Sequence, residues 1–292
     1  MDGFLNLLKP PGMSSHDVVG VVRKVLGIRR VGHGGTLDPA AAGVLPVAVG
    51  RAARLLEYLS SSDKSYRAEI LLGMATDSGD AMGRITERAE GFSMPSEEGL
   101  WCVLEEFRGS IAQQPPALSA IKVGGRKACD MARQDMDVKL PARQVEIHSI
   151  SLLAVYPGEG KFLIDVDCSK GTYIRSLCAD IGKRLGIPSV LSFLLRTRAG
   201  DFRLADACTI EEFMEMGEAA LLSPESCLSH IPRYELPEHR IKPFCNGLPT
   251  GEPAGGWPSL LRVYGAGEFL GIGRYDAGEK AVYPVKVYKE HI

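Results

Sequence analysis

The sequence predicts an α+β protein in which a large first domain is followed by a small all-β module. Three observations support this prediction. Between residue 1 and about residue 231, segments that alternate with period two are interspersed with segments at helical spacing. After about residue 230 the helical spacing ends, and short alternating segments follow a run of turn residues. A chain of 292 residues is long enough for one large domain, residues 1–231, and one small domain, residues 232–292.

Capping residues mark three helices of the first domain. The stretch SSHDVVGVVRKVLG follows a Pro-Pro-Gly break, offers Ser14 or Ser15 as a cap and repeats valines at helical spacing. The stretch SEEGLWCVLEEF has Ser96 as a cap and two acids in its first turn. The stretch IRSLCADIGKRLG shows one apolar face and ends at Gly186. We expect helices over all three.

Alternating segments predict the strands. In YRAEILLG, Tyr66 and every second residue after it would share one face, and FLIDVDCS alternates in the same way. Beyond the turn-rich stretch NGLPTGEPAGGWPS, the segments LLRVYG, EFLGIGRY and VYPVKVY predict a small sheet. Residues 113–143 differ from both patterns, because they open with Gln-Gln-Pro-Pro and carry six lysines or arginines with little apolar periodicity. We interpret them as an exposed, mobile insertion.

Composition narrows the class of protein. The formal net charge of −2 argues against a nonspecific nucleic-acid binder. Local cationic clusters, which are either solvated faces or phosphate contacts, are formed by Arg23, Lys24, Arg29 and Arg30, by Lys122, Arg126, Lys127 and Arg133, by Lys139 and Arg143, and by Arg196 and Arg198. Seven scattered cysteines favour a reducing compartment over a disulfide framework. With no signal pattern and no apolar run near 18 residues, we expect a cytoplasmic protein without a membrane contact.

The stretch GHGGTLDPAAAGVLPVAVG contains one acid, Asp38. In one interpretation Asp38 caps a short helical turn, with Pro39 as its first residue and Gly43 as its stop. In the other, Asp38 is a catalytic carboxylate. The sequence has no phosphate-binding loop with its lysine, no third metal ligand near His33 and Asp38, and no Gly-x-Ser-x-Gly elbow. A carboxylate site without a cofactor remains, and it would need a cation and an aromatic side chain.

The stretch CSKGTYIRSL offers both groups. It places Tyr173 at the end of a strand and Arg175 in the first turn of the following helix. The helix dipole disfavours a cation at that position, which indicates a partner anion for Arg175. The alternative is a surface arginine without a fixed contact.

Five stretches together resemble the TruB family of bacterial tRNA pseudouridine synthases, which act on uridine 55 of the T loop. They are KPPGMSS, GHGGTLDPAAAGVLPVAVGRA, KSYRAEILLGMATDSGDAMG, CSKGTYIRSLCADIG and LLRTRAG. The resemblance covers nearly the whole chain, and the C-terminal module is similar to a PUA domain. It implies the pseudouridine-synthase fold, with a mixed, mainly antiparallel sheet flanked by helices and with residues 113–143 as a thumb that grips RNA.

The resemblance also implies roles for individual residues. Asp38 matches the nucleophile, Tyr66 the aromatic that stacks on the target base and often moves a proton, and Arg175 the arginine that pairs with the nucleophile. The expected substrate-binding residues are Lys9, His33, Gly35, Thr36, Lys170, Tyr173, Leu194 and Arg196. Because the reaction breaks and forms bonds within one nucleotide, no cofactor and no metal are implied. The expected partner is the T stem-loop of tRNA, with no protein partner and a monomeric enzyme.

Two departures from the family pattern and three alternatives stay open. The chain has Leu118 where the family usually has an aromatic, and Ala128-Cys129 where it usually has Leu-Tyr; both lie in the insertion. One alternative is a guide-RNA-dependent synthase of the same superfamily, although the insertion favours a stand-alone enzyme. Another is a non-catalytic RNA-binding or RNA-folding protein. The third, an unrelated protein with a capped turn at Asp38, leaves the other four stretches unexplained.

Overall fold

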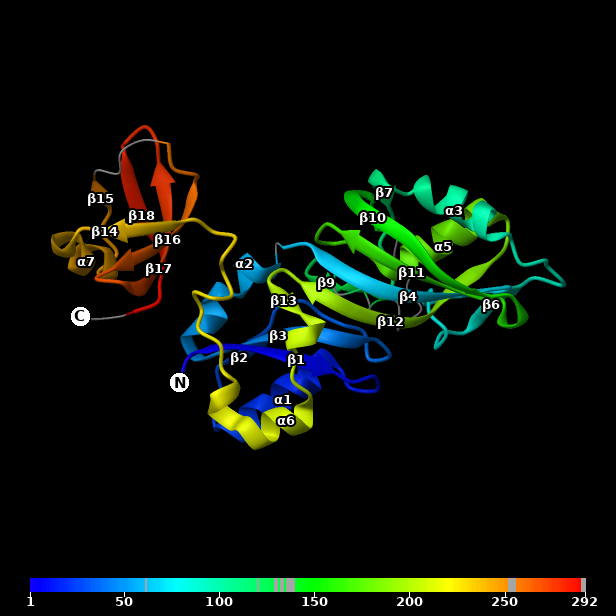
Figure 1. Cartoon of the computed structure of the whole chain (residues 1–292), viewed down its shortest axis with the longest axis horizontal. Coiled ribbons are helices and arrows are strands. Elements are labelled where there is room, and N and C mark those ends of the chain that lie inside the picture. Colours follow the sequence, from blue (N-terminus) through cyan, green and yellow to red (C-terminus); the bar gives the residue numbers. More distant parts are fainter. Residues whose placement is uncertain are drawn as a thin grey trace.

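The computed structural model describes residues 1–60, 62–119, 121–128, 131, 134, 140–251 and 256–289. These residues form a large α+β domain and a smaller body built on a separate sheet (Figure 1). No helix among the described residues is long and apolar enough to cross a membrane.

A nine-stranded sheet, counted over the described residues, forms the centre of the large domain. Its main path runs β1 (Gly3–Lys9), β3 (Ala42–Val49), β12 (Ser189–Ala199), β4 (Lys64–Leu72), β11 (Lys161–Cys168), β10 (Arg143–Tyr156) and β7 (Gly109–Gln113), with β2 (Val31–His33) on β3 and β13 (Phe202–Arg203) on β12. The β3–β12 pair is parallel and the other pairs are antiparallel. The predicted mixed, mainly antiparallel sheet is therefore confirmed.

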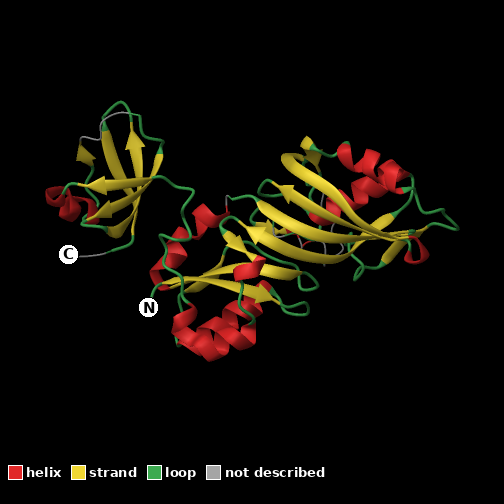
Figure 2. Cartoon of the chain, in the orientation of Figure 1, coloured by secondary structure: helices red, strands yellow, loops and turns green. Residues whose placement is uncertain are grey.

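Helices cover the sheet in two groups (Figure 2). In one group, α3 (Glu97–Glu105) packs on β10 and α5 (Ile174–Leu185) packs on β12 and β4. In the other, α1 (Ser15–Leu26) packs on β2 and α6 (Ile210–Met216) on β1. Short elements connect them: η1 (Gly50–Leu55), α2 (Leu56–Ser60), β5 (Met74–Thr76), β6 (Ile85–Arg88), η2 (Pro157–Glu159), η3 (Leu204–Asp206) and η4 (Gly217–Ala220). All three predicted helices are present, because their local caps are strong: Ser14 forms a capping box in α1, Ser96 caps α3, and Gly186 ends α5 in the left-handed conformation.

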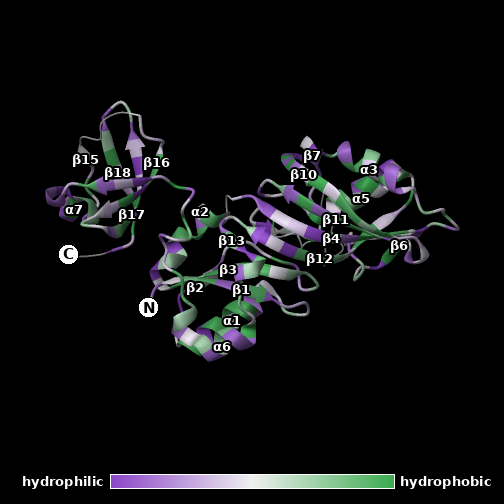
Figure 3. Cartoon of the chain, viewed as in Figure 1, coloured by the Kyte–Doolittle hydropathy of each residue, from purple (hydrophilic) through white to green (hydrophobic). Residues whose placement is uncertain are grey.

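The period-two alternation of the strands produces the main core. Ala68, Ile70 and Leu72 of β4 are buried on the face that α3 and α5 cover, together with alternate residues of β11. Figure 3 shows the resulting bands of apolar and polar residues along the strands. Tyr66 packs against this same core at one end of β4.

The smaller body contains β14 (Arg233–Leu236), α7 (Glu238–Cys245), β15 (Thr250–Gly251), β16 (Leu260–Gly265), β17 (Glu268–Asp276) and β18 (Ala281–Val287). Its strands form one sheet in the order β14-β16-β17-β18-β15. The three strands expected from alternation are present, whereas helix α7 was not part of the all-β prediction. Ile272 of β17 joins an apolar cluster with Leu55 and Leu228, so the two bodies pack against each other.

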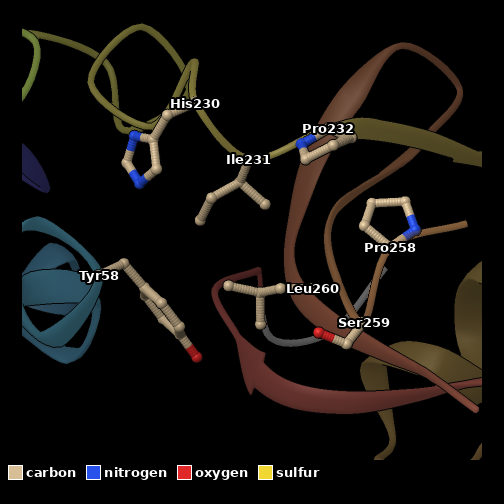
Figure 4. Close-up of a pocket in the computed structure, with 7 residues that line it drawn as sticks. All are labelled: Tyr58, His230, Ile231, Pro232, Pro258, Ser259 and Leu260. Atoms are coloured by element: carbon tan, nitrogen blue, oxygen red, sulfur yellow. The ribbon is translucent and has the colours of Figure 1, made fainter. Parts of the chain in front are cut away.

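A pocket of about 230 Å³ lies at this junction (Figure 4). It is lined by Tyr58 of α2, by His230, Ile231 and Pro232 of the connection, and by Pro258, Ser259 and Leu260. None of the predicted site residues lines it. The pocket is therefore separate from the site that the sequence predicts.

The insertion begins and ends at one point of the sheet. Gln113, the last residue of β7, pairs with Arg143, the first residue of β10. Within the insertion, β8 (Lys122–Val123) and β9 (Arg126–Lys127) form a hairpin. Cys129, Arg133 and Lys139 lie outside the described residues.

The capped helical turn, one of the two interpretations given above for Asp38, does not form. The Ala41 N–H donates to the Asp38 carbonyl oxygen at 3.0 Å, which closes a single β-turn, and β3 begins at Ala42. Gly43 is the second residue of this strand and not a helix stop. It adopts φ +115°, and a Cβ there would lie 2.2 Å from the Arg196 carbonyl oxygen. Gly43 is required because β12 passes against the backbone of β3 at this position.

Candidate active site

Asp38 lies on a turn that neighbouring elements hold on both sides. The Leu37 N–H donates to Ser15 Oγ at 2.9 Å, and the Ser15 hydroxyl in turn donates to the Leu37 carbonyl oxygen at 3.1 Å. On the other side, the Pro39 carbonyl accepts from the Gly12 N–H at 2.8 Å. The Asp38 side chain projects from this fixed turn and is 43% exposed.

Arg175 is the partner of Asp38. Its Nε lies 3.0 Å from Asp38 Oδ2, while Nη1 donates to the Ser78 carbonyl at 2.9 Å and Nη2 to the Leu118 carbonyl at 2.8 Å. The Arg175 side chain is only 7% exposed. As predicted, Arg175 lies in the first turn of α5. Because each of its three nitrogens has a partner, the guanidinium is fixed and can orient the carboxylate.

Asp80 is a second acid at Arg175 that sequence reasoning missed. Its Oδ2 lies 3.8 Å from Arg175 Nη1, and its Oδ1 accepts from Ser78 Oγ at 2.8 Å. Asp80 belongs to the quoted stretch KSYRAEILLGMATDSGDAMG, but so does Asp77, which pairs with Arg84. The sequence shows two acids in one loop and does not indicate which of them faces α5.

Tyr66 and Arg196 are directly opposite each other in the β4–β12 pair. Arg196 is 1% exposed, and its guanidinium donates to the Val44 carbonyl at 2.7 Å and to the Gly35 carbonyl at 3.2 Å. Burial raises the pKa of Tyr66 above its usual 10, while the charge and hydrogen bond of Arg196 act against this and the charge of Asp38 adds to it. The tyrosine and the carboxylate therefore belong to one electrostatic site.

Leu194 continues the wall of the site on β12. It pairs with Ala68, two residues along β4 from Tyr66, and is 9% exposed within the core cluster that also holds Leu37. Its position suits an apolar contact with a flat ring near Tyr66.

His33, Gly35 and Thr36 form the approach to the Asp38 turn. His33 ends β2, and among the described residues its buried Nδ1 has no hydrogen-bond partner. Burial lowers the pKa of His33, and the charge of Arg196 lowers it further. The Gly35 carbonyl is occupied by Arg196, whereas Thr36 is exposed.

The sequence predicts Tyr173 at the end of a strand, and this prediction is wrong. β11 ends at Cys168, and Tyr173 occupies the N-cap position of α5 after an intervening turn. The Arg143 guanidinium lies 4.8 Å from the centre of the Tyr173 ring. Lys170 is exposed in the same turn. The extra turn allows Tyr173 to contact the base of the insertion.

Lys9 differs from the substrate-binding residue that the resemblance implies. Its side chain is fully buried, and its ammonium donates to the carbonyls of Pro10, Met13 and Pro39 at 2.9, 2.6 and 3.2 Å. Burial lowers the pKa of Lys9 to about 8, although the charge of Asp38 opposes this. Lys9 thus links the Pro-Pro-Gly loop to the turn that carries Asp38 through their backbone carbonyls, on the buried side of that turn.

The assembled groups suit nucleophilic chemistry by a carboxylate. A half-exposed carboxylate is oriented by a buried guanidinium, and its charge acts on Tyr66, which packs on the same apolar cluster as Leu37 and Leu194. Among the described residues, no group of three or more histidines, cysteines or acids could hold a metal ion. The arrangement can present one carboxylate oxygen to a flat ligand that lies on Tyr66.

Solved structures with this fold are known. A structure of an H/ACA RNP bound to a substrate RNA containing 2'-deoxyuridine matches with a TM-score of 0.75 and 26% identity, over 98% of this chain and 85% of that one. A Cbf5-Nop10-Gar1 complex matches with a TM-score of 0.75 and 27% identity, over 99% and 85% of the two chains.

Sequence comparison identifies the class and then the family. Residues 23–174 match the model of the TruB family pseudouridylate synthase N-terminal domain, so the fold is that of a pseudouridylate synthase. A protein of Moorella thermoacetica named tRNA pseudouridine synthase B is 45% identical over 98% of both chains, and one of the same name from Symbiobacterium thermophilum is 50% identical over 80% of this chain and 78% of that one. The chain belongs to the TruB family.

Proposed function

We propose that the chain converts uridine 55 in the T loop of tRNA to pseudouridine, with Asp38 as the nucleophile. The observation that carries this proposal is the 3.0 Å contact between Asp38 and the buried Arg175, in a chain of the TruB family. Relatives at 41–50% identity are named tRNA pseudouridine synthase B, which supports tRNA as the substrate.

The reaction rearranges bonds within one nucleotide. The N1–C1′ bond breaks, the uracil turns, and C5 bonds to C1′; the C5 hydrogen leaves as a proton and N1 gains one. Asp38 adds either to C6 of the ring or to C1′ of the sugar, and both routes need a carboxylate held in one orientation. Arg175 supplies that orientation. The nucleotide itself covers the half-exposed Asp38, which excludes water and strengthens the electrostatic contacts of the site.

Tyr66 and the residues near it hold the base. The target must leave its stack at a cost of a few kcal/mol, and stacking on an aromatic ring returns about 1–3 kcal/mol per base. Tyr66 provides that ring, and Leu194 and Tyr173 complete the pocket. His33 stacks where the base has been, and Thr36 and Lys170 contact the RNA backbone near the flipped nucleotide.

Two further parts recognise the stem-loop. The insertion, residues 113–143, acts as the thumb, and the body from residue 232 to 292 acts as a PUA-like RNA-binding domain. The exposed cations of the insertion and of α7, among them Arg126 and Lys242, support phosphate contacts. The enzyme works as a monomer, which sedimentation at micromolar concentration tests. Free cysteines spread through the described residues support a reducing compartment, so the reaction takes place in the cytoplasm.

A guide-RNA-dependent synthase is the second candidate, favoured by the H/ACA complexes that share the fold. Those matches have 26–27% identity, against 45% for the Moorella protein. The two candidates differ in one measurable respect: the stand-alone enzyme modifies tRNA without added RNA or protein.

The test uses a tRNA transcript carrying tritium at uracil C5, because forming the C5–C1′ bond releases that label. We expect the parent chain alone to release the label, Asp38→Asn to release none, and the matched control Asp180→Asn, whose carboxylate pairs with Lys183 on the surface of α5, to match the parent. A transcript with cytidine at position 55 should lose the signal. If the parent binds tRNA but releases no label, the chain is an RNA-binding protein and the proposal is rejected.

A further inference from the structure

Gln113 makes a two-point contact with the backbone of Tyr173. Its Oε1 accepts from the Tyr173 N–H at 2.7 Å, and its Nε2 donates to the Tyr173 carbonyl at 3.1 Å. Gln113 is 0% exposed, although it is the last residue of β7 and the first residue of the insertion. A fully buried amide with both of its groups bonded to one residue holds that residue in a single place.

Three more contacts link the insertion to the same short segment, residues 171–176. Ser176 Oγ donates to the Gln114 carbonyl at 2.8 Å, and Arg143 at the far end of the insertion bonds to the Gly171 carbonyl. Within the insertion, the Leu118 carbonyl accepts from Arg175. Both ends and one interior residue of the insertion therefore contact the start of α5.

This segment carries the cation that orients the nucleophile. Tyr173 is the N-cap of α5, and Arg175 is two residues further on. Because the Tyr173 N–H and carbonyl are both bonded to Gln113, a shift of β7 moves the first turn of α5 with it. A shift of that turn displaces Arg175 Nε from Asp38 Oδ2. Rate depends steeply on such displacements, since about 1 Å of misplacement can cost about 100-fold.

We propose that Gln113 is a positioning residue that couples the seating of the insertion to the Arg175–Asp38 pair. RNA held by the insertion fixes the end of β7, Gln113 passes that position to Tyr173, and Arg175 then holds Asp38 in its reactive orientation. The inference rests on the proposed function, and it adds a residue to the site that neither contacts the base nor carries charge.

The experiment measures kcat and KM for tritium release by Gln113→Leu and Gln113→Glu, together with their thermal unfolding. Leucine removes both bonds to Tyr173, whereas glutamate keeps the acceptor for its N–H. We expect kcat of Gln113→Leu to fall by about 10- to 100-fold while KM stays within about twofold. The kcat of Gln113→Glu should lie between those of Gln113→Leu and the parent.

The matched control is Gln144→Leu. Gln144 lies beside this position on β10, is exposed and bonds only to Ser110 among the contacts described, so its kcat should equal that of the parent. A double-mutant cycle gives the second readout. If Gln113 acts through Arg175, adding Gln113→Leu to Arg175→Lys should lower kcat by less than about twofold more.

Three results would overturn the proposal: a parental kcat in Gln113→Leu, a loss of kcat no larger than the loss of folded protein, or losses that multiply in the double variant. If the parent itself releases no label, the proposed function fails and this inference fails with it. If the parent is active and Gln113→Leu equals it, this inference alone fails.

Discussion

Replacing Arg175 by methionine should separate the structural contribution of the guanidinium from its catalytic contribution. The substitution keeps an apolar stem of similar length in a site where the side chain is 7% exposed, and it removes every polar contact. Two of these contacts go to backbone carbonyls, of Ser78 and Leu118, and two go to carboxylates, at 3.0 Å from Asp38 and 3.8 Å from Asp80. The carbonyl contacts determine the loss of stability, and the contact with Asp38 determines the loss of rate.

The structure gives the size of the stability loss. Each buried carbonyl that loses its partner costs about 1–3 kcal/mol. The Asp38 pair adds only about 0–1 kcal/mol, because Asp38 is 43% exposed and water replaces the guanidinium. Relief from burying a charge offsets part of the loss, so we expect a net loss of about 2–4 kcal/mol. At about 2–4 °C per kcal/mol for a domain of this size, Tm should fall by roughly 10 °C.

The catalytic loss should be larger than the structural one. With Asp38 free to rotate, kcat for tritium release should fall by about 100-fold or more at a temperature where the variant is fully folded. Arg175→Lys should also lose rate, since one ammonium cannot replace three fixed contacts. The matched control is Arg184→Met on the same helix, whose exposed pair with Glu106 should contribute about 0–1 kcal/mol. A parental kcat in Arg175→Met, or a raised KM with unchanged kcat, would refute the orienting role.

Three shorter predictions concern the surrounding residues. Because burial raises the pKa of Tyr66 above 10, its phenol is neutral from pH 6 to 9. The ratio of kcat for the parent to kcat for Tyr66→Phe should therefore stay constant over that range. A ratio that rises with pH would show that the ionised phenol takes part in the reaction. Gly43→Ala should lower the free energy of unfolding, measured by urea titration, by about 3 kcal/mol or more, because its Cβ would meet the Arg196 carbonyl. The control is Gly20→Ala, whose Cβ lies in open space on α1 and which should raise the free energy of unfolding by about 0.5–1 kcal/mol. The pKa of Lys9 is about 8 in the folded chain, against 10.5 for an unperturbed lysine such as that of the unfolded chain. Below pH 8 Lys9 is protonated in both the folded and the unfolded chain, and above pH 8 the unfolded chain holds more protons. The stability of the parent relative to Lys9→Met should therefore rise between pH 8 and 10, by at most about 1.4 kcal/mol per pH unit, and a flat difference would contradict the lowered pKa.

Elements whose signals are local were predictable from the sequence. Ser14 with Asp17 closes the capping box of α1, and Gly186 ends α5, because both features depend on residues within one turn. Alternation identified β4 and β11 for the same reason. Each of these predictions needs no knowledge of a distant partner.

The stretch after Asp38 has the composition of a capped helical turn but does not form one, because its conformation depends on a distant strand. Asp-Pro-Ala-Ala-Ala-Gly has the residues of a capped helical turn, and alanine favours a helix. Ala42 and Gly43 instead pair with Leu195 and Arg196 of β12, and only a residue without a Cβ allows that approach. Tertiary pairing overrides local propensity here.

In the candidate site, the sequence predicted the main pair and missed its supports. Arg175 was indicated because a cation in the first turn of a helix needs an anion, and Asp38 lies 3.0 Å from it. Asp80 and Gln113 carry no comparable local signal. An acid in a polar loop and a glutamine before two prolines are ordinary residues until the fold brings them to α5.

The buried cations show why charge clusters in a sequence overstate the surface available to RNA. Lys9 and Arg196 are at most 1% exposed, and they donate to backbone carbonyls around the site, among them those of Pro39 and Gly35. Arg198 pairs with Asp167 at 2.6 Å, and Arg143 bonds to the backbone before α5. These side chains stabilise the turns around the site, and a donor that is bonded to a carbonyl or a carboxylate there is not available to a phosphate. The exposed cations available to RNA are therefore fewer than the sequence suggests, because cations such as Lys9 and Arg196 hold the turns around Asp38 in place.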